Sequence, residues 1–318
     1  MSTISSLIEK SGRGLTSIKM MFADPVRQLA RFHGLDANEF EFNKVLNTIR
    51  LEKIKLELPN QPRLHFLIKR YRILTDLQEQ LNAKFVYENE SILVRFANLE
   101  LEIDTEQDLS VINEIFILCV YNFHFPDNCV MVDIGMNVGF ASLFFANNKK
   151  VEKVFSYEPF KPTFAQAQKN IKRNQYQSIK IEAYNFGLSG EEKTLEIDYS
   201  YEKNASVGIN GMSEFYIGKV KTEKQIIEIK TITALFDIIN AHNDTANIGI
   251  KMDCEGAEYE MIPQLVVNPN FSKVKFIMLE WHFKGGEANI EKLSSNGFCC
   301  FSFNPMNKET GLIYATRI

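Results

Sequence analysis

Cysteine is scarce in this chain, and no two cysteines have the CxxC spacing of a redox or zinc-binding motif. Five occur among 318 residues, which is an odd number, and two of the five are adjacent. A disulfide framework or a zinc module needs a larger, paired set of thiols. We therefore expect reduced thiols and assign no chemistry to Cys119, Cys129, Cys254, Cys299 or Cys300.

Basic charge is not in excess either. The 36 Lys and Arg residues stand against 40 Asp and Glu, for a formal net charge of −4. Binding to phosphate backbones or to anionic lipid depends on a surplus of Lys and Arg. The composition therefore predicts that nucleic acid is not a partner.

Long apolar runs are also missing. No stretch approaches the ~20 apolar residues of a membrane-spanning helix. Charged side chains interrupt residues 1–22 before the length of a signal-peptide core is reached. We therefore expect a cytoplasmic protein without a membrane span.

The chain does have enough apolar residues, 45% of the total, to bury a full core. Residues 38–58 and 63–84 carry apolar side chains at three- and four-residue spacing, which predicts two amphipathic helices. Three short alternating runs between residues 85 and 104 predict a small β meander. Residues 106–123 return to a helical pattern with an acidic first turn. We predict an N-terminal helical cap with a small meander at residues 1–109.

From about residue 128 strand-like and helical patterns alternate, which indicates a doubly wound α/β fold with a mostly parallel sheet. The last two strand-like runs, "GFCCFSFNP" and "GLIYATRI", are separated only by "MNKET". That connection is too short for a parallel crossover, so the C-terminal strand is predicted to be antiparallel. Including this strand, the runs predict a seven-stranded Rossmann-like sheet within residues 110–318, at residues 129–134, 151–158, 178–184, 247–253, 273–281, 298–304 and 311–318.

One insertion, residues 199–224, is rich in Gly, Ser, Asn and aromatic residues and lies between two strand-like runs. A hairpin loop is the simpler interpretation. A lid over the substrate is the alternative, because long loops in compact domains are often functional.

The stretch "VMVDIGMNVGF" delivers Asp133 to the end of a strand and then turns at Gly135 and Gly139 into a helix. Glycines at such a turn let the backbone approach a ligand closely. A dinucleotide fingerprint would read GxGxxG, but Asn137 stands at the position of its second glycine. The turn therefore favours another nucleotide-like ligand over NAD, although a purely structural turn is the alternative.

An acid follows at the end of the next strand, where "VFSYEPF" places Glu158. At this position a carboxylate can accept hydrogen bonds from both hydroxyls of a ribose. A solvated acid at the start of a helix is the alternative interpretation.

Acidic residues also end two later strands. "IGIKMDCEGAEYEMI" carries Asp253 and Glu255, and "FIMLEWHF" carries Glu280 and His282 on one face of a strand. Carboxylates in a first helical turn stabilise the helix without any function. That explanation is sufficient for Glu260, accounts equally well for Glu258, and is weaker for Asp253, which stands where an open α/β sheet presents groups to its ligand.

These motifs together resemble the FkbM family of S-adenosylmethionine-dependent methyltransferases. The likeness covers residues 110–318 and depends on "DIGMNVG", on "YEPF" with Asn170 downstream, and on "IKMDCEGAE". It implies a class I methyltransferase fold, with residues 110–318 as the S-adenosylmethionine-binding domain. It also implies a cofactor site in which the glycine turn surrounds the methionine end, Glu158 holds the ribose and the segment at Asn185 lies near the adenine: Asp133, Gly135, Asn137, Gly139, Glu158 and Asn185.

Methyl transfer to a hydroxyl needs an aligned oxygen and a base that takes its proton. Asp253 and His282 are the candidate proton acceptors, while Glu255 and Glu280 would orient the substrate or the base. A divalent metal held by these four residues and clamping a diol is a rival use of the cluster. We predict no metal site, because the spacing does not define a ligand geometry.

The predicted function is an S-adenosylmethionine-dependent O-methyltransferase that acts on a small molecule or a glycan hydroxyl, with oxygen preferred mainly through the family resemblance. A nicotinamide-dependent oxidoreductase is the alternative enzyme, and the missing GxGxxG counts against it. A binding protein that keeps the fold without turnover is the alternative outside enzymes. The helices predicted between residues 38 and 82 would then serve as an interface, including one between identical chains, or as a cap over the active site.

Overall fold

The computed structural model describes five stretches of the chain, residues 24–126, 128–212, 216–242, 247–303 and 309–318. The N-terminal segment considered as a signal peptide and part of the predicted final connection, residues 306–308, lie outside them. Two units divide between Ala97 and Asn98. The boundary predicted at residue 109 lies within the second unit and stays a prediction. No helix of the described stretches is long and apolar enough to cross a bilayer.

One prediction for the first unit is wrong, because residues 38–58 form strands and not a helix. Buried side chains alternate along these strands, as at Ile49 and Leu51 and at Leu56 and Leu58. The sequence of this segment fits both the two-residue period of a strand and the spacing of a helix. The strands are joined by turns that hold residues with positive φ, which a helix does not accommodate. The segment forms a three-stranded antiparallel sheet after a short 3-10 turn: η1 (Ala37–Glu39), β1 (Phe40–Asn43), β2 (Thr48–Leu51) and β3 (Leu56–Pro59).

Two other predicted segments of the N-terminal region have the expected secondary structure, whereas their role as a cap stays a prediction. The segment at residues 63–84 is helical up to Leu81, and Asn82 ends it in the left-handed conformation with φ 54°. The three runs of the meander are strands, and the first two pair antiparallel. The elements are α2 (Pro25–Phe32), η2 (Pro62–Leu64), α3 (Phe66–Lys69), α4 (Tyr71–Leu81), β4 (Lys84–Glu88) and β5 (Ser91–Phe96), followed in the second unit by β6 (Leu99–Ile103).

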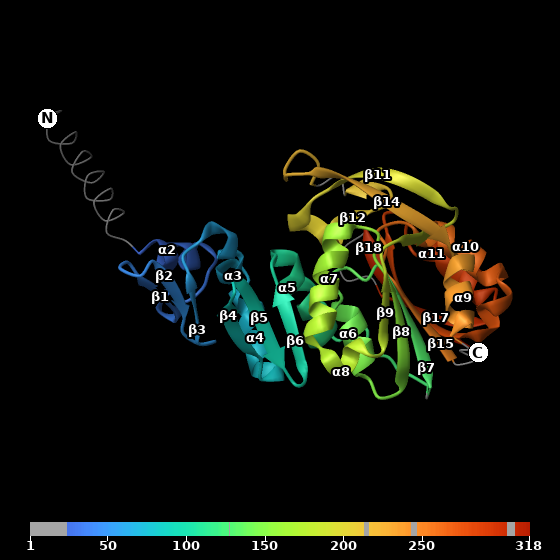
Figure 1. Ribbon diagram of the computed structural model, residues 1–318, viewed down its shortest axis with the longest axis horizontal. Helices are drawn as coiled ribbons and strands as arrows, with labels where there is room; N and C mark the ends of the chain where they lie inside the picture. The colour runs from blue at the N-terminus through green and yellow to red at the C-terminus, as the bar shows by residue number, and fades with distance from the viewer. Residues whose placement is uncertain (1–23, 127, 213–215, 243–246, 304–308) are drawn as a thin grey trace, which may run out of the picture. The chain divides into compact units, whose positions relative to one another are not determined.

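The second unit is built on the predicted seven-stranded sheet (Figure 1), whose order is β17-β18-β16-β15-β7-β8-β9. The pairs β15–β16, β7–β15, β7–β8 and β8–β9 are parallel. β18 runs antiparallel to both of its neighbours, which confirms the predicted direction of the last strand. The strands are β7 (Cys129–Ile134), β8 (Val151–Tyr157), β9 (Ile181–Tyr184), β15 (Asn247–Met252), β16 (Val274–His282), β17 (Phe298–Phe303) and β18 (Thr310–Arg317).

Helices cover both faces of this sheet (Figure 1), as a doubly wound fold requires. A large core cluster lies on one face, where β7 and β15 contribute Val132 and Ile250 and the helices contribute Phe236 and Ile262. One face carries α6 (Phe140–Asn147), α7 (Lys161–Arg173) and α8 (Gln175–Ser178), and the other α9 (Ile232–Ala241), α10 (Glu258–Val267) and α11 (Glu287–Ser294).

The helix predicted at residues 106–123 is shorter than expected. It consists of α5 (Glu106–Ile112), which a capping box between Thr105 and Asp108 starts, and a π-helical turn, η3 (Asn113–Ile117). The sequence pattern continues to Phe123, but Cys119 has a positive φ of 56°, which a helix cannot contain.

The insertion at residues 199–224 is carried by a hairpin. β14 (Glu223–Thr231) pairs antiparallel with β11 (Lys193–Tyr199) and parallel with β10 (Gly187–Ser189). The described part of the insertion contains η4 (Tyr201–Ser206), β12 (Val207–Gly208) and β13 (Gly211–Met212). Its role as a lid stays a prediction.

Gly249 in β15 is expected to tolerate no side chain. A Cβ atom there would lie 2.1 Å from the ring of Phe276, its partner in β16, which is 1% exposed. Overpacking of this kind costs about 1–3 kcal/mol, so Gly249→Ala should lower the free energy of unfolding by that amount in urea titrations. The double variant Gly249→Ala/Phe276→Leu should recover part of the loss, and a single variant as stable as the parent would contradict the packing.

Candidate active site

The predicted site residues gather where β9, β8, β7, β15 and β16 end, because the carboxyl ends of parallel strands share one edge of a sheet. The turn after β7 touches the turn after β15. The backbone N–H of Asp253 donates to the carbonyl of Ile134 at 3.0 Å. A Cβ on Gly135 would lie 1.7 Å from the carbonyl oxygen of Asp253, so only glycine fits there. The predicted cofactor turn and the predicted acceptor turn are therefore in direct contact.

The glycine turn has the conformation that its sequence predicts. Gly135 and Gly139 have φ angles of 79° and 90°, and Gly139 precedes the first residue of α6. Asn137 between them also has a positive φ, 52°, which Asn tolerates better than most side chains. Its side-chain oxygen is buried, and no described residue donates a hydrogen bond to it. This atom can accept a hydrogen bond from a ligand in the turn.

Asp133 lies beneath the turn and is wholly buried. Ser142 donates a hydrogen bond to one carboxylate oxygen at 2.6 Å, and the ammonium of Lys251 lies 3.1 Å from the other. The carboxylate thus binds groups of the chain itself. Lys251 was not among the predicted site residues, although a lysine within the apolar strand "IGIKM" was a signal that it has a buried partner.

Glu158 follows β8 and is 5% exposed. Its two carboxylate oxygens accept hydrogen bonds from the backbone N–H groups of Asn137 at 3.0 Å and Phe160 at 2.9 Å. Burial raises the pKa of Glu158 to about 7, against the opposing effect of these two bonds. Asn185 lies beside it, where its amide donates to the carbonyls of Glu158 and Pro159 at 2.9 and 3.2 Å.

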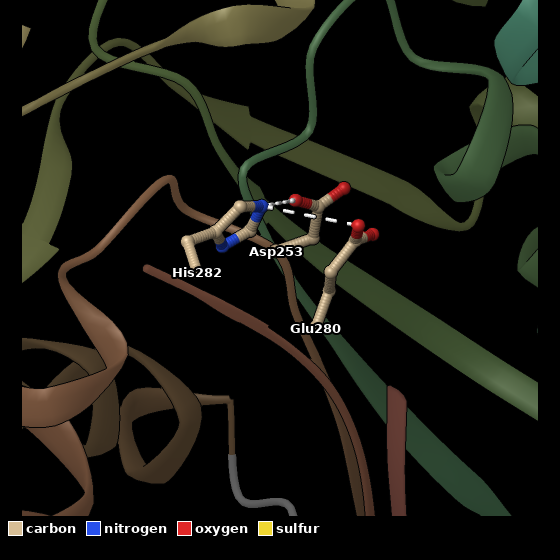
Figure 2. Close-up of side chains that lie close together, drawn as sticks. All are labelled: Asp253, Glu280 and His282. Atoms are coloured by element: carbon tan, nitrogen blue, oxygen red, sulfur yellow. Dashed lines mark ion pairs between the residues drawn. The ribbon is translucent and has the colours of Figure 1, made fainter. Parts of the chain in front are cut away.

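The four predicted catalytic residues also converge (Figure 2 shows three of them). Nε2 of His282 lies 3.8 Å from a carboxylate oxygen of Asp253, 3.8 Å from one of Glu255 and 3.9 Å from one of Glu280. The imidazole is 4% exposed, whereas the carboxylates of Asp253 and Glu280 are 32% and 27% exposed. The two carboxylates are therefore the more accessible part of the cluster, and the imidazole is buried behind them.

Glu258 supports His282 from the other side of the ring. Its fully buried carboxylate accepts the backbone N–H of His282 at 2.7 Å and lies 3.3 Å from Nδ1. Burial lowers the pKa of His282, but the bond to Glu258 and the charges of Glu255 and Asp253 raise it to about 10. At neutral pH this side chain is an imidazolium whose Nδ1–H can donate a hydrogen bond to Glu258. Helix stabilisation accounted for Glu258 equally well in the sequence, so this contact was not predicted.

The other three residues of the cluster are carboxylic acids. Burial and the charge of Asp253 raise the pKa of Glu280, and burial raises the pKa of Glu255 to about 7 despite the nearby imidazolium. Asp253, Glu280 and His282 offer ligand atoms within 4.8 Å of one another, close enough to share a metal ion. Their use in that way stays a hypothesis.

The insertion reaches this cluster. A Cβ on Gly208 in β12 would lie 2.5 Å from Cβ of Glu255, and one on Gly256 would lie 2.8 Å from the amide nitrogen of Asn210. The short β12–β13 pair therefore packs against the turn that carries Asp253 and Glu255.

The strand order, with an antiparallel β18 between β16 and β17, defines the sheet of a class I methyltransferase with a Rossmann-like fold. The chain belongs to the FkbM methyltransferase family. The family model described as "Methyltransferase FkbM domain" matches residues 133–304, which is more than half of the chain.

Individual relatives are distant. Methyltransferase 1 of Beauveria bassiana (strain ARSEF 2860) is 23% identical over 161 residues, which cover 47% of this chain and 64% of that protein. A crystal structure of methyltransferase FkbM from Methylobacillus flagellatus KT is 15% identical with a TM-score of 0.41, over 78% of this chain and 59% of that one. Streptococcus pneumoniae Sp1610, a putative tRNA (m1A22) methyltransferase in complex with S-adenosyl-L-methionine, is 10% identical with a TM-score of 0.36, over 63% and 71%. These structural likenesses are too distant to bear on function. The chain spans less than two thirds of the length of the Beauveria protein.

The buried Glu158 is expected to make stability depend on pH. Its pKa is about 7 in the folded protein against an ordinary value of 4.5. The unfolded chain therefore ionises first, and the parent loses stability as pH rises between these values. Without cofactor, Glu158→Gln should gain about 1–3 kcal/mol in stability relative to the parent between pH 4.5 and pH 8. Glu152→Gln, an exposed change in β8, should show no such pH-dependent difference. A Glu158→Gln variant whose difference from the parent is the same at both pH values would contradict the shift.

Proposed function

We propose that this chain is an S-adenosylmethionine-dependent methyltransferase that transfers a methyl group to a hydroxyl of a small molecule or a glycan. The contact between the glycine turn and the acidic cluster around His282 is the observation that best supports it. Gly135 and Asp253 join the two groups with no room for a side chain between them. A methyl donor and its acceptor need this adjacency, because the reacting atoms must lie about 3–3.5 Å apart.

The described residues fit the cofactor. Each oxygen of Glu158 accepts one backbone hydrogen bond and keeps a further lone pair, so the carboxylate can still accept from the two ribose hydroxyls. The orphan oxygen of Asn137 and the open backbone at Gly135 and Gly139 suit the methionine end. Asn185, tied to the end of β8, would border the adenine. When bound, S-adenosylmethionine supplies an electrophilic methyl group on a sulfonium.

Asp253 is the proposed proton acceptor. Lys251 lies 3.7 Å from one of its oxygens and His282 lies 3.8 Å from the other, so cations flank the carboxylate on both sides. Asp253 would take the proton of the acceptor hydroxyl as that oxygen is methylated. His282 carries a proton already at neutral pH, which revises its expected role from base to the group that orients the carboxylates.

Glu255 and Glu280 would hold the acceptor in place. Both are partly exposed beside Asp253, with 19% and 27% of their side chains accessible. A carboxyl group accepts hydrogen bonds through its oxygens and, when protonated, also donates one, so the pair suits a hydroxylated ligand that can do both. A sugar or another polyol presents hydroxyl donors at this spacing, which supports a hydroxylated acceptor.

The alternatives have less support. Membership of the FkbM family favours methyl transfer over the nicotinamide-dependent reaction and over a binding protein without turnover. Asp253, Glu280 and His282 offer ligand atoms close enough to share a metal ion, but the proposed proton transfer to Asp253 does not need one, so we propose a reaction without a metal. The cytoplasmic location and self-association through the N-terminal region remain proposals, the latter weakened by the strands found at residues 38–58.

Cofactor binding tests this function directly. Isothermal calorimetry should show binding of S-adenosylmethionine to the parent, and Glu158→Gln should weaken it at least tenfold, because one of two charge-assisted acceptor sites for the ribose is lost. Glu152→Gln should bind as the parent does. No detectable binding at millimolar cofactor would exclude the proposed reaction, whereas unchanged binding by Glu158→Gln would exclude only the ribose assignment.

Asp253→Asn should separate chemistry from binding. A screen of sugars and hydroxylated metabolites for S-adenosylhomocysteine release would first supply an acceptor. With it, kcat of Asp253→Asn should fall about 100- to 10,000-fold, the contribution of a general base, while the cofactor Kd changes little. Asp237→Asn, an exposed change on α9, is the matched control. A kcat within threefold of the parent would remove Asp253 from the role of base.

A further inference from the structure

Lys251 is a charged residue in the centre of the molecule, with 2% of its surface exposed. It belongs to β15, and its register partner in the neighbouring strand β7 is Asp133. Its ammonium lies 3.1 Å from the Asp133 carboxylate and donates to the carbonyl of Gly135 at 2.6 Å. The same ammonium lies 3.7 Å from Asp253. One buried cation therefore touches the acid beneath the glycine turn, the turn itself and the proposed base.

Lys251 stays charged in this position. Burial lowers its pKa, but the charges of Asp133 and Asp253 outweigh that effect and hold the pKa above its usual value. A buried lysine without such a partner would give up its proton. The charge is thus a permanent part of the site, and Asp133 exists in the structure as half of an ion pair.

This pairing changes what Asp133 can do. An acid before the first glycine could have bound a cationic group of the cofactor. Its two oxygens instead face Lys251 and Ser142, and none of its surface is exposed. Any influence of Asp133 on a ligand must pass through the groups that it holds.

We infer that Lys251 is a positioning residue, which, with Asp133 as its counter-ion, fixes the Gly135 backbone for cofactor binding and orients the Asp253 carboxylate toward the acceptor. The inference rests on the proposed function, and it adds the residue that connects the cofactor-binding turn to the proposed base. The ammonium bonds to the turn through the Gly135 carbonyl and flanks the Asp253 carboxylate opposite His282. No part of Lys251 needs to touch the cofactor.

A double-variant comparison tests this inference, with thermal unfolding and calorimetric binding of S-adenosylmethionine measured on the full chain. Lys251→Met and Asp133→Asn each leave one buried group without its partner, so each should lower Tm and weaken cofactor binding at least tenfold. The double variant Lys251→Met/Asp133→Asn has no unpaired buried charge. Its Tm should return most of the way to that of the parent, whereas the cofactor affinity should stay at least tenfold weaker because nothing holds the Gly135 carbonyl.

Two results would overturn the inference. If Lys251 serves only the stability of the core, the double variant regains cofactor affinity together with Tm. If Asp133 binds a cationic group of the cofactor directly, Lys251→Met frees the carboxylate and binds the cofactor as tightly as the parent or more tightly. Where the methionine variants do not fold, Lys251→Gln and Lys251→Gln/Asp133→Asn replace them with the same expected outcomes.

Controls separate these results from failure of the proposed function. Lys275→Met changes a partly exposed lysine in β16 and should leave Tm and cofactor affinity unchanged. A parent that does not bind S-adenosylmethionine would exclude the methyltransferase itself. A parent that binds, together with a double variant that regains full affinity, would exclude only the role of Lys251.

Discussion

The buried ion pair between Lys251 and Asp133 is the constraint on which the centre of the molecule depends. Removal of one partner of such a pair costs about 3–5 kcal/mol, because the other charge is left without compensation. The two residues face each other across β15 and β7, so a slip of one residue in this register would separate them and turn every side chain of the strand to the other face. Sheet register and site geometry are therefore fixed by the same contact.

The Lys251–Asp133 pair belongs to a larger group of charges at the site. Two cations, Lys251 and His282, lie among five carboxylates, of which Asp133 and Glu258 are fully buried. The three partly exposed carboxyl groups belong to residues 253, 255 and 280, and burial raises the pKa of Glu255 and Glu280. The cluster therefore becomes more negative as pH rises and these two groups ionise.

Much of the fold and the place of the site could be predicted from the sequence, because glycines and acids mark the strand ends in the order in which parallel strands present them. The spacing of apolar residues could not decide between a helix and strands for residues 38–58, because both patterns are present there. The structure has strands, with positive φ at Asn47 and Lys55 in the turns between them. The protonation of His282 and the partner of Asp133 also escaped prediction. Both depend on residues brought close only by folding, as Glu258 and Lys251 are.

The packing of Gly208 against Glu255 links the inserted hairpin to the turn that carries Asp253 and Glu255. Because a side-chain carbon on Gly208 would lie only 2.5 Å from Cβ of Glu255, no side chain fits at this position unless that turn moves. Under the proposed function, a substitution at Gly208 would therefore shift one of the acids assigned to positioning of the acceptor. The effects of changes in β12 or β13 and of changes in the turn at Glu255 should then not be additive.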